Sequence, residues 1–502
     1  MSSLSNTTVS SNGFSPSFGQ CVDINDCRTV SSIFWSCFSV IVICTWTAIH
    51  PNIPLVGTHS ATVFYQNLEI MVLALLTPEL IVLWAARQWY SANRIARKFK
   101  RYGWGKSHAF FILMGGFALY DGEKFCGYLW EKREEVDEEY WDQIVSLHQR
   151  ESSGLSPHSS NLADQENDNQ AEFATLDANQ AHQVIDLEVQ SVEGSEDQKS
   201  SDPACLLEFF ITKGYITITE DEIKDNLSHG DVISKSVAII QTTWFLLQVI
   251  ARAAEGLAIT ELEIVTVAFA LLSFATYFLW WNKPLRIRHP IRVDWRRHEL
   301  TSSNKLDEAS GGWVNTMREG VAAILNYTTP SQARNTPDFI AQIIMFPITA
   351  IVHFINLASA ITNENTAENI PKVLLSARLG KKGPLRLYIP IYCIACVFGG
   401  IHCIAWAFRF PTHTDQVLWR ISSVIVAIVP FTLGVLHWYL KSIARNISRF
   451  VSFLLVTPAM LLGILYMVAR AILIVVALSA LRDLPPSAYQ TVRWTTFIPH
   501  IG

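Results

Sequence analysis

The sequence predicts an all-α membrane protein, a polytopic bundle of about seven to nine transmembrane helix segments with a disordered acidic insert. Half of the 502 residues are hydrophobic but 17% are charged, which fits charges placed in loops between apolar spans. Two apolar runs of helical length, Val237–Ala251 and Leu262–Trp281, flank a short charged turn and form a central transmembrane hairpin. Aromatic and then basic residues follow the second run, as at a cytoplasmic membrane boundary.

Charge is unevenly distributed along the chain. Between Glu131 and Asp202 there are 19 acidic and 4 basic residues, a net charge of −15, so the remainder carries +10 of the total of −5. This stretch is rich in Ser, Gln and Asn, which is the composition of a disordered loop. A basic membrane body favours an anionic lipid bilayer as partner and argues against nucleic acid.

The elements before the insert begin with a first span at Thr29–Ile49, which ends at two prolines. The next apolar run, Leu68–Trp84, contains Glu79 directly after a proline. Ala85–Tyr102 has apolar residues at helical spacing with basic residues between them, which predicts an amphipathic helix on the cytoplasmic face. Ser107–Tyr120 is too short for a span, so a re-entrant or interfacial segment is expected.

The elements after the insert begin with a capping-box pattern at Thr219 and Glu222, which predicts a short helix. A second short helix is expected near Val314–Leu325. The last apolar stretch is too long for one straight span, so we expect a span ending near Met467 and then a broken half-helix. The apolar runs of this half are Phe339–Ala360, Leu387–Phe408, Val417–Leu440 and Val451–Leu481.

Membrane topology follows in part from the positive-inside rule, which places the basic stretches 85–106 and 283–297 in the cytosol. If 107–120 does not cross, the N-terminus is also cytosolic and the turn Arg252–Glu261 is lumenal. Two basic loops, 372–386 and 441–449, then fall on the lumenal side unless Phe339–Ala360 is re-entrant. Charge alone leaves this choice open. Cys21 and Cys27 would pair only if the N-terminus faced an oxidising lumen.

These patterns divide the chain into eight regions, and we expect a multi-pass protein of the endoplasmic reticulum or the plasma membrane. The regions are a polar tail (1–28), first membrane segments with the basic amphipathic helix (29–120), the acidic disordered insert (121–204), a small juxtamembrane element (205–236), the central hairpin (237–281), a cytosolic loop (282–338), C-terminal membrane segments (339–481) and an interfacial tail (482–502).

Several stretches are distinctive: HPNIP at His50–Pro54, GWGKSHAFFILMGGF, WFLLQVIARAAEGLAITELE, FLWWNKPL, FGGIHCIAW and WTTFIPH. Together they resemble a broad group of uncharacterised fungal polytopic integral membrane proteins, some of which are linked to specialised-metabolite clusters. The resemblance covers most of the chain outside the insert. It implies a multi-pass membrane protein and supplies no catalytic residues.

Ionisable side chains within or beside apolar runs are the candidate functional residues, because in a membrane they must be paired or face water. Those on the hairpin turn have an ordinary alternative, since Thr260 can cap a helix whose acidic first turn suits the helix dipole. Glu79 has no such explanation. The candidate catalytic groups are Glu79, Glu255, Glu261 and Glu263, and the candidate binding groups are Arg252, His353, His402 and Arg470.

Arg470 has two interpretations: a partner of Glu79 or an anion site, or a boundary residue that snorkels to the interface, which we favour. A zinc site at Cys393, Cys396 and His402 is not expected, because at 100° per residue the histidine lies about 240° from the second cysteine. We expect no metal and no cofactor. Glycosylation sequons occur at Asn6, Asn226, Asn326 and Asn446.

The leading functional expectation is an integral membrane protein that transports or handles a small apolar metabolite. A phosphate-binding loop, a GxSxG elbow, HExxH and paired DDxxD-type carboxylates are absent from the sequence. The alternatives are a membrane-embedded cyclase or isomerase that uses intramembrane carboxylates, and a membrane scaffold. Whether the chain is an enzyme is left open.

Overall fold

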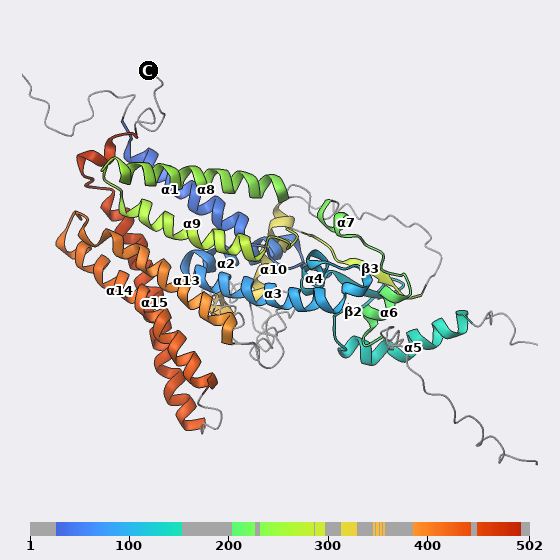
Figure 1. Cartoon of the computed structure of the whole chain (residues 1–502). Helices are drawn as coiled ribbons and strands as arrows, with labels where there is room; N and C mark the ends of the chain where they lie inside the picture. The colour runs from blue at the N-terminus through green and yellow to red at the C-terminus, as the bar shows by residue number, and fades with distance from the viewer. Residues whose placement is uncertain are drawn as a thin grey trace, which may run out of the picture.

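The computed structural model describes residues 27–152, 203–225, 231–285, 287–296, 313–328, 345–346, 348–350, 352–353, 355–356, 385–442 and 449–492 (Figure 1). This part of the chain is mostly helical, as predicted, and six of its helices are long and apolar enough to cross a membrane. They are α1 (Val30–Ala48), α8 (Asp231–Ala254), α9 (Glu261–Leu279), α13 (Leu385–His402), α14 (His413–Ser442) and α15 (Arg449–Ala480).

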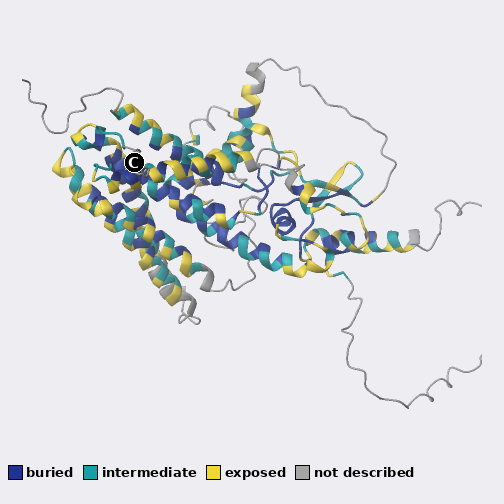
Figure 2. Ribbon diagram, turned by 45° about the horizontal axis from the view of Figure 1, so that its top comes forward, coloured by how far each residue is buried: buried dark blue, intermediate teal, exposed yellow. Residues whose placement is uncertain are grey.

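The outer faces of these helices carry large apolar side chains. Ile240 and Trp244 on α8, and Met460, Leu461 and Ile464 on α15, are each at least half exposed. Figure 2 shows exposed residues along the outside of the helices and buried ones between them. An apolar surface of this extent is typical of a lipid-facing or partner-facing surface, and is compatible with an integral membrane protein.

Two further helices form a sharp bend. Helix α2 (Ser60–Leu76) ends at Thr77, and α3 (Pro78–Lys98) starts at an angle of 113° to it. Proline is well suited to a first helical position because it lacks an N–H and its φ is fixed near the helical value. We expected the apolar run to end, and an amphipathic helix to begin, at Trp84. That boundary was wrong, because the break between the two helices lies at Thr77. If the bent pair counts as one span, the number rises to seven.

A small mixed sheet lies beside the helices at the far end of α3. Its order is β2-β1-β3, with β1 (Phe117–Asp121) antiparallel to β2 (Lys124–Tyr128) and parallel to β3 (Ile291–Asp294). Short helices pack around it: α4 (Lys106–Leu113), α5 (Glu135–Ser152), α6 (Leu206–Thr212) and α7 (Glu220–Asp225). We call the sheet and these helices the α/β module.

The module corrects three expectations. Ser107–Tyr120 is not a re-entrant segment, because it forms α4, a tight turn and the central strand, with apolar side chains buried in the module. Gly116 in that turn has no room for a side chain, since an added Cβ would lie 2.3 Å from the Phe111 ring. The prediction of an all-α chain missed the sheet. The acidic insert is ordered as far as Ser152, and residues 153–202 lie outside the described part.

Contacts between distant segments define the two ends of the bundle. At one end, Arg28 before α1 pairs with Glu263 on α9, and Cys27 forms a β-bridge with Gln490 after α15. At the other end, the Lys283 amine after α9 bonds to the backbone carbonyl of His50 after α1. We call the first the disulfide end, because Cys27 is disulfide-bonded, and the second the basic end.

The polarity of the last three helices follows from similar contacts. The α13–α14 pair is antiparallel, because Trp419 donates to the His402 carbonyl near one end and Tyr392 bonds His437 near the other. Only residues 443–448 join α14 to α15, and about six residues span about 20 Å at most. Since α15 leads to Gln490, helices α13 and α15 both run from the basic end to the disulfide end.

This arrangement overturns the expected position of the N-terminus. Arg28 lies at the same end as the hairpin turn, so the start of α1 and that turn share a side. Helix α15 also runs unbroken to Ala480, so no half-helix follows Met467. The short helix expected near Val314–Leu325 is present as α10 (Trp313–Thr328), and the capping box at Thr219 is formed.

Candidate functional site

Glu79 occupies the second position of α3, immediately after the bend. Its Oε1 accepts a hydrogen bond of 2.6 Å from the Tyr466 hydroxyl on α15, and the residue is 9% exposed. Its Oε2 is buried and has no hydrogen-bond partner among the described residues. A carboxylate at such depth costs roughly 2.5–3.5 kcal/mol on membrane-insertion scales, so a half-satisfied one is an unusual feature.

Arg470 lies one helical turn beyond Tyr466 on α15 and is 1% exposed. Its guanidinium donates to the backbone carbonyls of Leu75 and Leu76 at 3.3 and 3.4 Å. These are the last carbonyls of α2 and have no N–H donor within that helix. Arg470 supplies the hydrogen-bond donors that they lack. The guanidinium also lies over the Phe398 ring at 4.1 Å. The expectation that Arg470 snorkels at a boundary was therefore wrong.

His402 ends α13 and is fully buried. Its Nδ1 is 2.9 Å from the Phe398 carbonyl oxygen, which assigns the proton to Nδ1 and leaves Nε2 as an acceptor. That Nε2 has no hydrogen-bond partner in the part of the chain that the structure describes. Phe398 joins the two groups, because its ring lies 4.9 Å from the His402 ring and beneath Arg470.

The structure thus brings three of the eight sequence candidates together, with Tyr466 as a member that the sequence did not reveal. We call Glu79, Tyr466, Arg470 and His402 the broken-helix cluster. It combines one carboxylate oxygen and one imidazole nitrogen without partners, one buried cation and aromatic walls. Such a set can bind a small molecule that carries one hydrogen-bonding group, or exchange a proton.

The hairpin-turn candidates form a separate structural cluster at the disulfide end. Arg252 is 1% exposed and donates to the backbone carbonyls of Gln490, Ala258 and Ser487 at 2.6, 2.7 and 3.2 Å. Glu263 forms a capping box with Thr260, as the structural alternative predicted. These contacts tie α8, α9 and the C-terminal loop together. Glu261, which is buried, and Glu255, which is half-buried, lie on the same turn.

His353 pairs with a partner that the sequence did not indicate. Its Nδ1 lies 2.7 Å from Oε1 of Glu69 on α2, and the Tyr327 ring is 4.6 Å away. Glu69, Tyr327 and His353 come from three separate segments of the sequence. Glu69 is the second residue of the predicted apolar run Leu68–Trp84, and its burial depends on a tertiary contact that periodicity does not reveal.

Lys283 is the second buried cation that the sequence placed wrongly, as part of an exposed basic collar. It is 1% exposed, and its Nζ donates to the His50 carbonyl, to Asn52 Oδ1 at 3.0 Å and to Gln88 Oε1 at 2.8 Å. The rings of Trp280 and Trp84 lie 4.5 and 5.0 Å away. Burial lowers the pKa of the Lys283 amine well below its usual value.

The remaining candidates are placed as follows. Asn326 is exposed on α10, while Asn6, Asn226 and Asn446 lie outside the described residues. Cys393 and Cys396 are free thiols. Within the described ranges, three or more His, Cys, Asp or Glu side chains nowhere gather as they would around a metal ion.

Comparison with known proteins gives one match. Residues 196–338 match a family of unknown function (DUF8562). The matched region contains α8, α9, β3 and α10 and therefore the hairpin and Lys283, but not the broken-helix cluster. No curated protein and no solved structure matches the chain.

Proposed function

We propose that this chain is a multi-pass integral membrane protein that binds a small, mostly apolar metabolite at the broken-helix cluster and moves it through the bilayer. One observation carries the proposal. Two buried atoms of the cluster, Glu79 Oε2 and His402 Nε2, have no hydrogen-bond partner among the described residues. A buried polar atom without a partner costs about 1–3 kcal/mol. A ligand that supplied a hydrogen bond to either atom would recover that energy.

The interrupted helix supports the same proposal. Membrane transporters commonly place binding sites at discontinuous helices, where freed backbone groups and half-helix ends meet the ligand. Here Arg470 already occupies the freed carbonyls of α2, and the first turn of α3 presents Glu79. The apolar surroundings, with Phe398 and Phe269 at 4.1 and 5.1 Å from the guanidinium, favour an apolar ligand body.

The experiment compares metabolites inside and outside cells that lack the chain, restored with wild type, with Glu79→Gln or with Glu255→Gln. Glu255 is the matched control, because it is a half-buried carboxylate at the disulfide end, away from the cluster. If the chain is a transporter, Glu79→Gln should change where a product accumulates by at least about threefold, and Glu255→Gln should not.

The same profile separates the rival enzyme. A cyclase or isomerase that uses Glu79 as its acid would lose its product and accumulate the precursor inside the cell. An unchanged profile in the Glu79→Gln cells would contradict both, and would leave the cluster with a structural role only. Each variant is first checked for normal amounts in the membrane fraction.

A further inference from the structure

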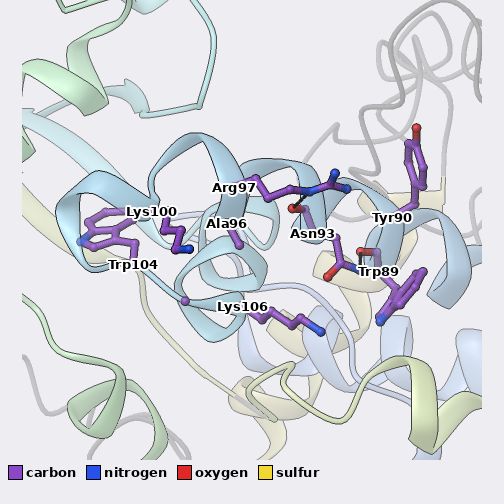
Figure 3. A pocket seen from close by; sticks show the side chains of 9 residues that line it. Trp89, Tyr90, Asn93, Ala96, Arg97, Lys100, Trp104 and Lys106 are labelled. Atoms are coloured by element: carbon purple, nitrogen blue, oxygen red, sulfur yellow. Dashed lines mark hydrogen bonds between the residues drawn. The ribbon is translucent and has the colours of Figure 1, made fainter. Parts of the chain in front are cut away.

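A cavity of about 610 Å³ lies along the exposed face of α3 where that helix leaves the bundle. Figure 3 shows the lining side chains, which come from α3, from the connection after it and from the start of α4. They include three aromatic residues, Trp89, Tyr90 and Trp104, and three cations, Arg97, Lys100 and Lys106. This cavity is separate from the broken-helix cluster.

The position along α3 sets the depth of the cavity. Trp89 follows Glu79 by ten residues, which is about 15 Å along a helix. If Glu79 lies near the middle of a bilayer core about 30 Å thick, Trp89 and Tyr90 lie at its edge. Arg97 lies about two turns beyond Trp89 on α3, Lys100 follows the end of that helix and Lys106 starts α4, so all three cations lie on the outer side of that edge. Aromatic residues followed by basic ones are characteristic of that boundary.

The cations that line the cavity differ from their neighbours on α3 and in the turn that follows it. Arg101 pairs with Glu208, Arg94 with Glu131 at 3.8 Å, and Lys98 donates to the Glu131 carbonyl at 2.6 Å. These neighbours face the α/β module. Their positive charges are used inside the protein and are not available to a ligand.

By contrast, Arg97, Lys100 and Lys106 are exposed and form no ion pair with any carboxylate of the described chain. Arg97 Nε donates to the Asn93 carbonyl at 3.2 Å, which holds the side chain along the helix (Figure 3). Three unpaired cations around one cavity, with no acid among its lining residues, form a site for a multiply charged anion.

The start of α4 does not provide this site. The Glu220 carboxylate accepts from Ser107 Oγ at 2.8 Å and lies close to Gly105, so an acidic side chain of the protein already occupies that helix end. The anion would therefore contact the side chains of Arg97, Lys100 and Lys106. Their methylene stems and the indole of Trp89 provide an apolar wall for the part of the ligand below the charge.

We infer that this cavity binds the phosphorylated headgroup of an anionic phospholipid from the leaflet at the basic end, with the upper acyl chain against Trp89. The chemistry shared with free phosphate is the phosphate group, and the indole of Trp89 beside the cations favours a lipid over free phosphate. Basic pockets beside membrane helices bind such headgroups elsewhere.

The test is calorimetric titration of the full chain in detergent with dioctanoyl phosphatidylinositol 4-phosphate, dioctanoyl phosphatidylcholine and inorganic phosphate. We expect saturable binding of the first, none of the second, and at least tenfold weaker binding of the third. The triple variant Arg97→Gln, Lys100→Gln and Lys106→Gln should bind the phosphoinositide at least tenfold more weakly.

The matched control removes three other exposed cations, Lys132, Lys213 and Arg318, by the same change to Gln, and should bind within twofold of wild type. Trp89→Leu should weaken binding of the lipid but not of phosphate. Equal binding by the two triple variants would overturn the proposal, as would phosphate binding as tight as that of the lipid. Thermal melting of every variant excludes loss of fold.

Discussion

The carboxylate of Glu79 accepts a 2.6 Å hydrogen bond from the hydroxyl of Tyr466, which lies 387 residues further along the chain. This bond fixes the start of α3 to the middle of α15. It satisfies only one oxygen of the carboxylate, so the contact that orients Glu79 also leaves its other oxygen available.

Replacing Tyr466 by Phe should destabilise the protein by about 1–3 kcal/mol, because Glu79 then loses this hydroxyl donor while still buried. Thermal or denaturant unfolding in detergent measures the change. The control is Tyr439→Phe, whose residue is 42% exposed. In a double-mutant cycle with Glu79→Gln, additive effects would show that the two groups do not interact.

Replacing Arg470 by Met should cost at least about 2 kcal/mol, since the carbonyls of Leu75 and Leu76 lose their donor at roughly 1–3 kcal/mol each. Arg470→Lys should recover only part, because one ammonium lacks the planar fork of the guanidinium. The amount of folded protein extracted from membranes reports the effect. Equal yields from Arg470→Met and the exposed control Arg318→Met would rule out a capping role.

Stability should depend on pH through Lys283. Burial lowers the pKa of its amine in the folded state, so the unfolded chain binds more protons between that pKa and the usual value of about 10.4. Over that window the free energy of unfolding should rise with pH by up to about 1.4 kcal/mol per pH unit. The same stabilisation should be lost as the pH falls to the pKa of the folded state.

Unfolding at several pH values between 7 and 10 measures this slope. Lys283→Met should flatten it, whereas Lys132→Met, a change at an exposed site, should not. A slope that Lys283→Met leaves intact would mean that another group titrates. Lys283→Met should also lower stability, because His50, Asn52 and Gln88 each lose a donor.

The two ends of the bundle should face opposite sides of the membrane. Arg28 lies at the disulfide end, so the sequon at Asn6 should be glycosylated in the secretory pathway, and those at Asn226, Asn326 and Asn446 should stay bare. A gel shift after glycosidase treatment, lost only in Asn6→Gln, checks this. Modification at Asn446 would place the α14–α15 connection on the wrong side.

Removing residues 153–200 tests the scaffold alternative. This deletion spares α5 and α6, which are part of the α/β module. If the acidic insert recruits partners, its loss should abolish the phenotype restored by wild type. If the broken-helix cluster carries the function, the deletion should leave the metabolite profile unchanged.

The membrane helices could be predicted from the sequence because length and hydropathy suffice for that. The ends predicted for the hairpin helices, Val237–Ala251 and Leu262–Trp281, lie within one to six residues of the observed helix ends. The sheet could not be predicted, since strand β1 is a short apolar run and its partner β3 lies beyond the hairpin. A short buried strand and a short buried helix have the same composition.

The candidate site was predictable only in part, for a related reason. Glu79, His402 and Arg470 are conspicuous as polar residues in apolar runs, but Tyr466 is an ordinary aromatic residue until its partner is known. Lys283 was misplaced because a lysine after an aromatic belt is normally exposed. Its burial depends on Trp84, Asn52 and Gln88, which come from other segments.

The topology of the C-terminal half also depends on tertiary contacts. Helix α1 begins and helix α15 ends at the disulfide end. The two basic stretches that conflicted with the positive-inside rule, 372–386 and 441–449, therefore adjoin helix ends at the basic end. Because α9 ends and α13 begins at the basic end, the segment between them starts and finishes there, which is compatible with the re-entrant alternative for Phe339–Ala360. Most of that run lies outside the described residues.

The parallel pairing of β1 with β3 imposes an order on biogenesis. During synthesis β1 and β2 emerge first, and their edge stays unpaired until α8 and α9 have been made and inserted. Only then does β3 reach the ribosome exit and close the sheet. A hairpin that failed to enter the lipid would therefore leave the edge of β1 unpaired, so assembly of the sheet reports on insertion of the hairpin.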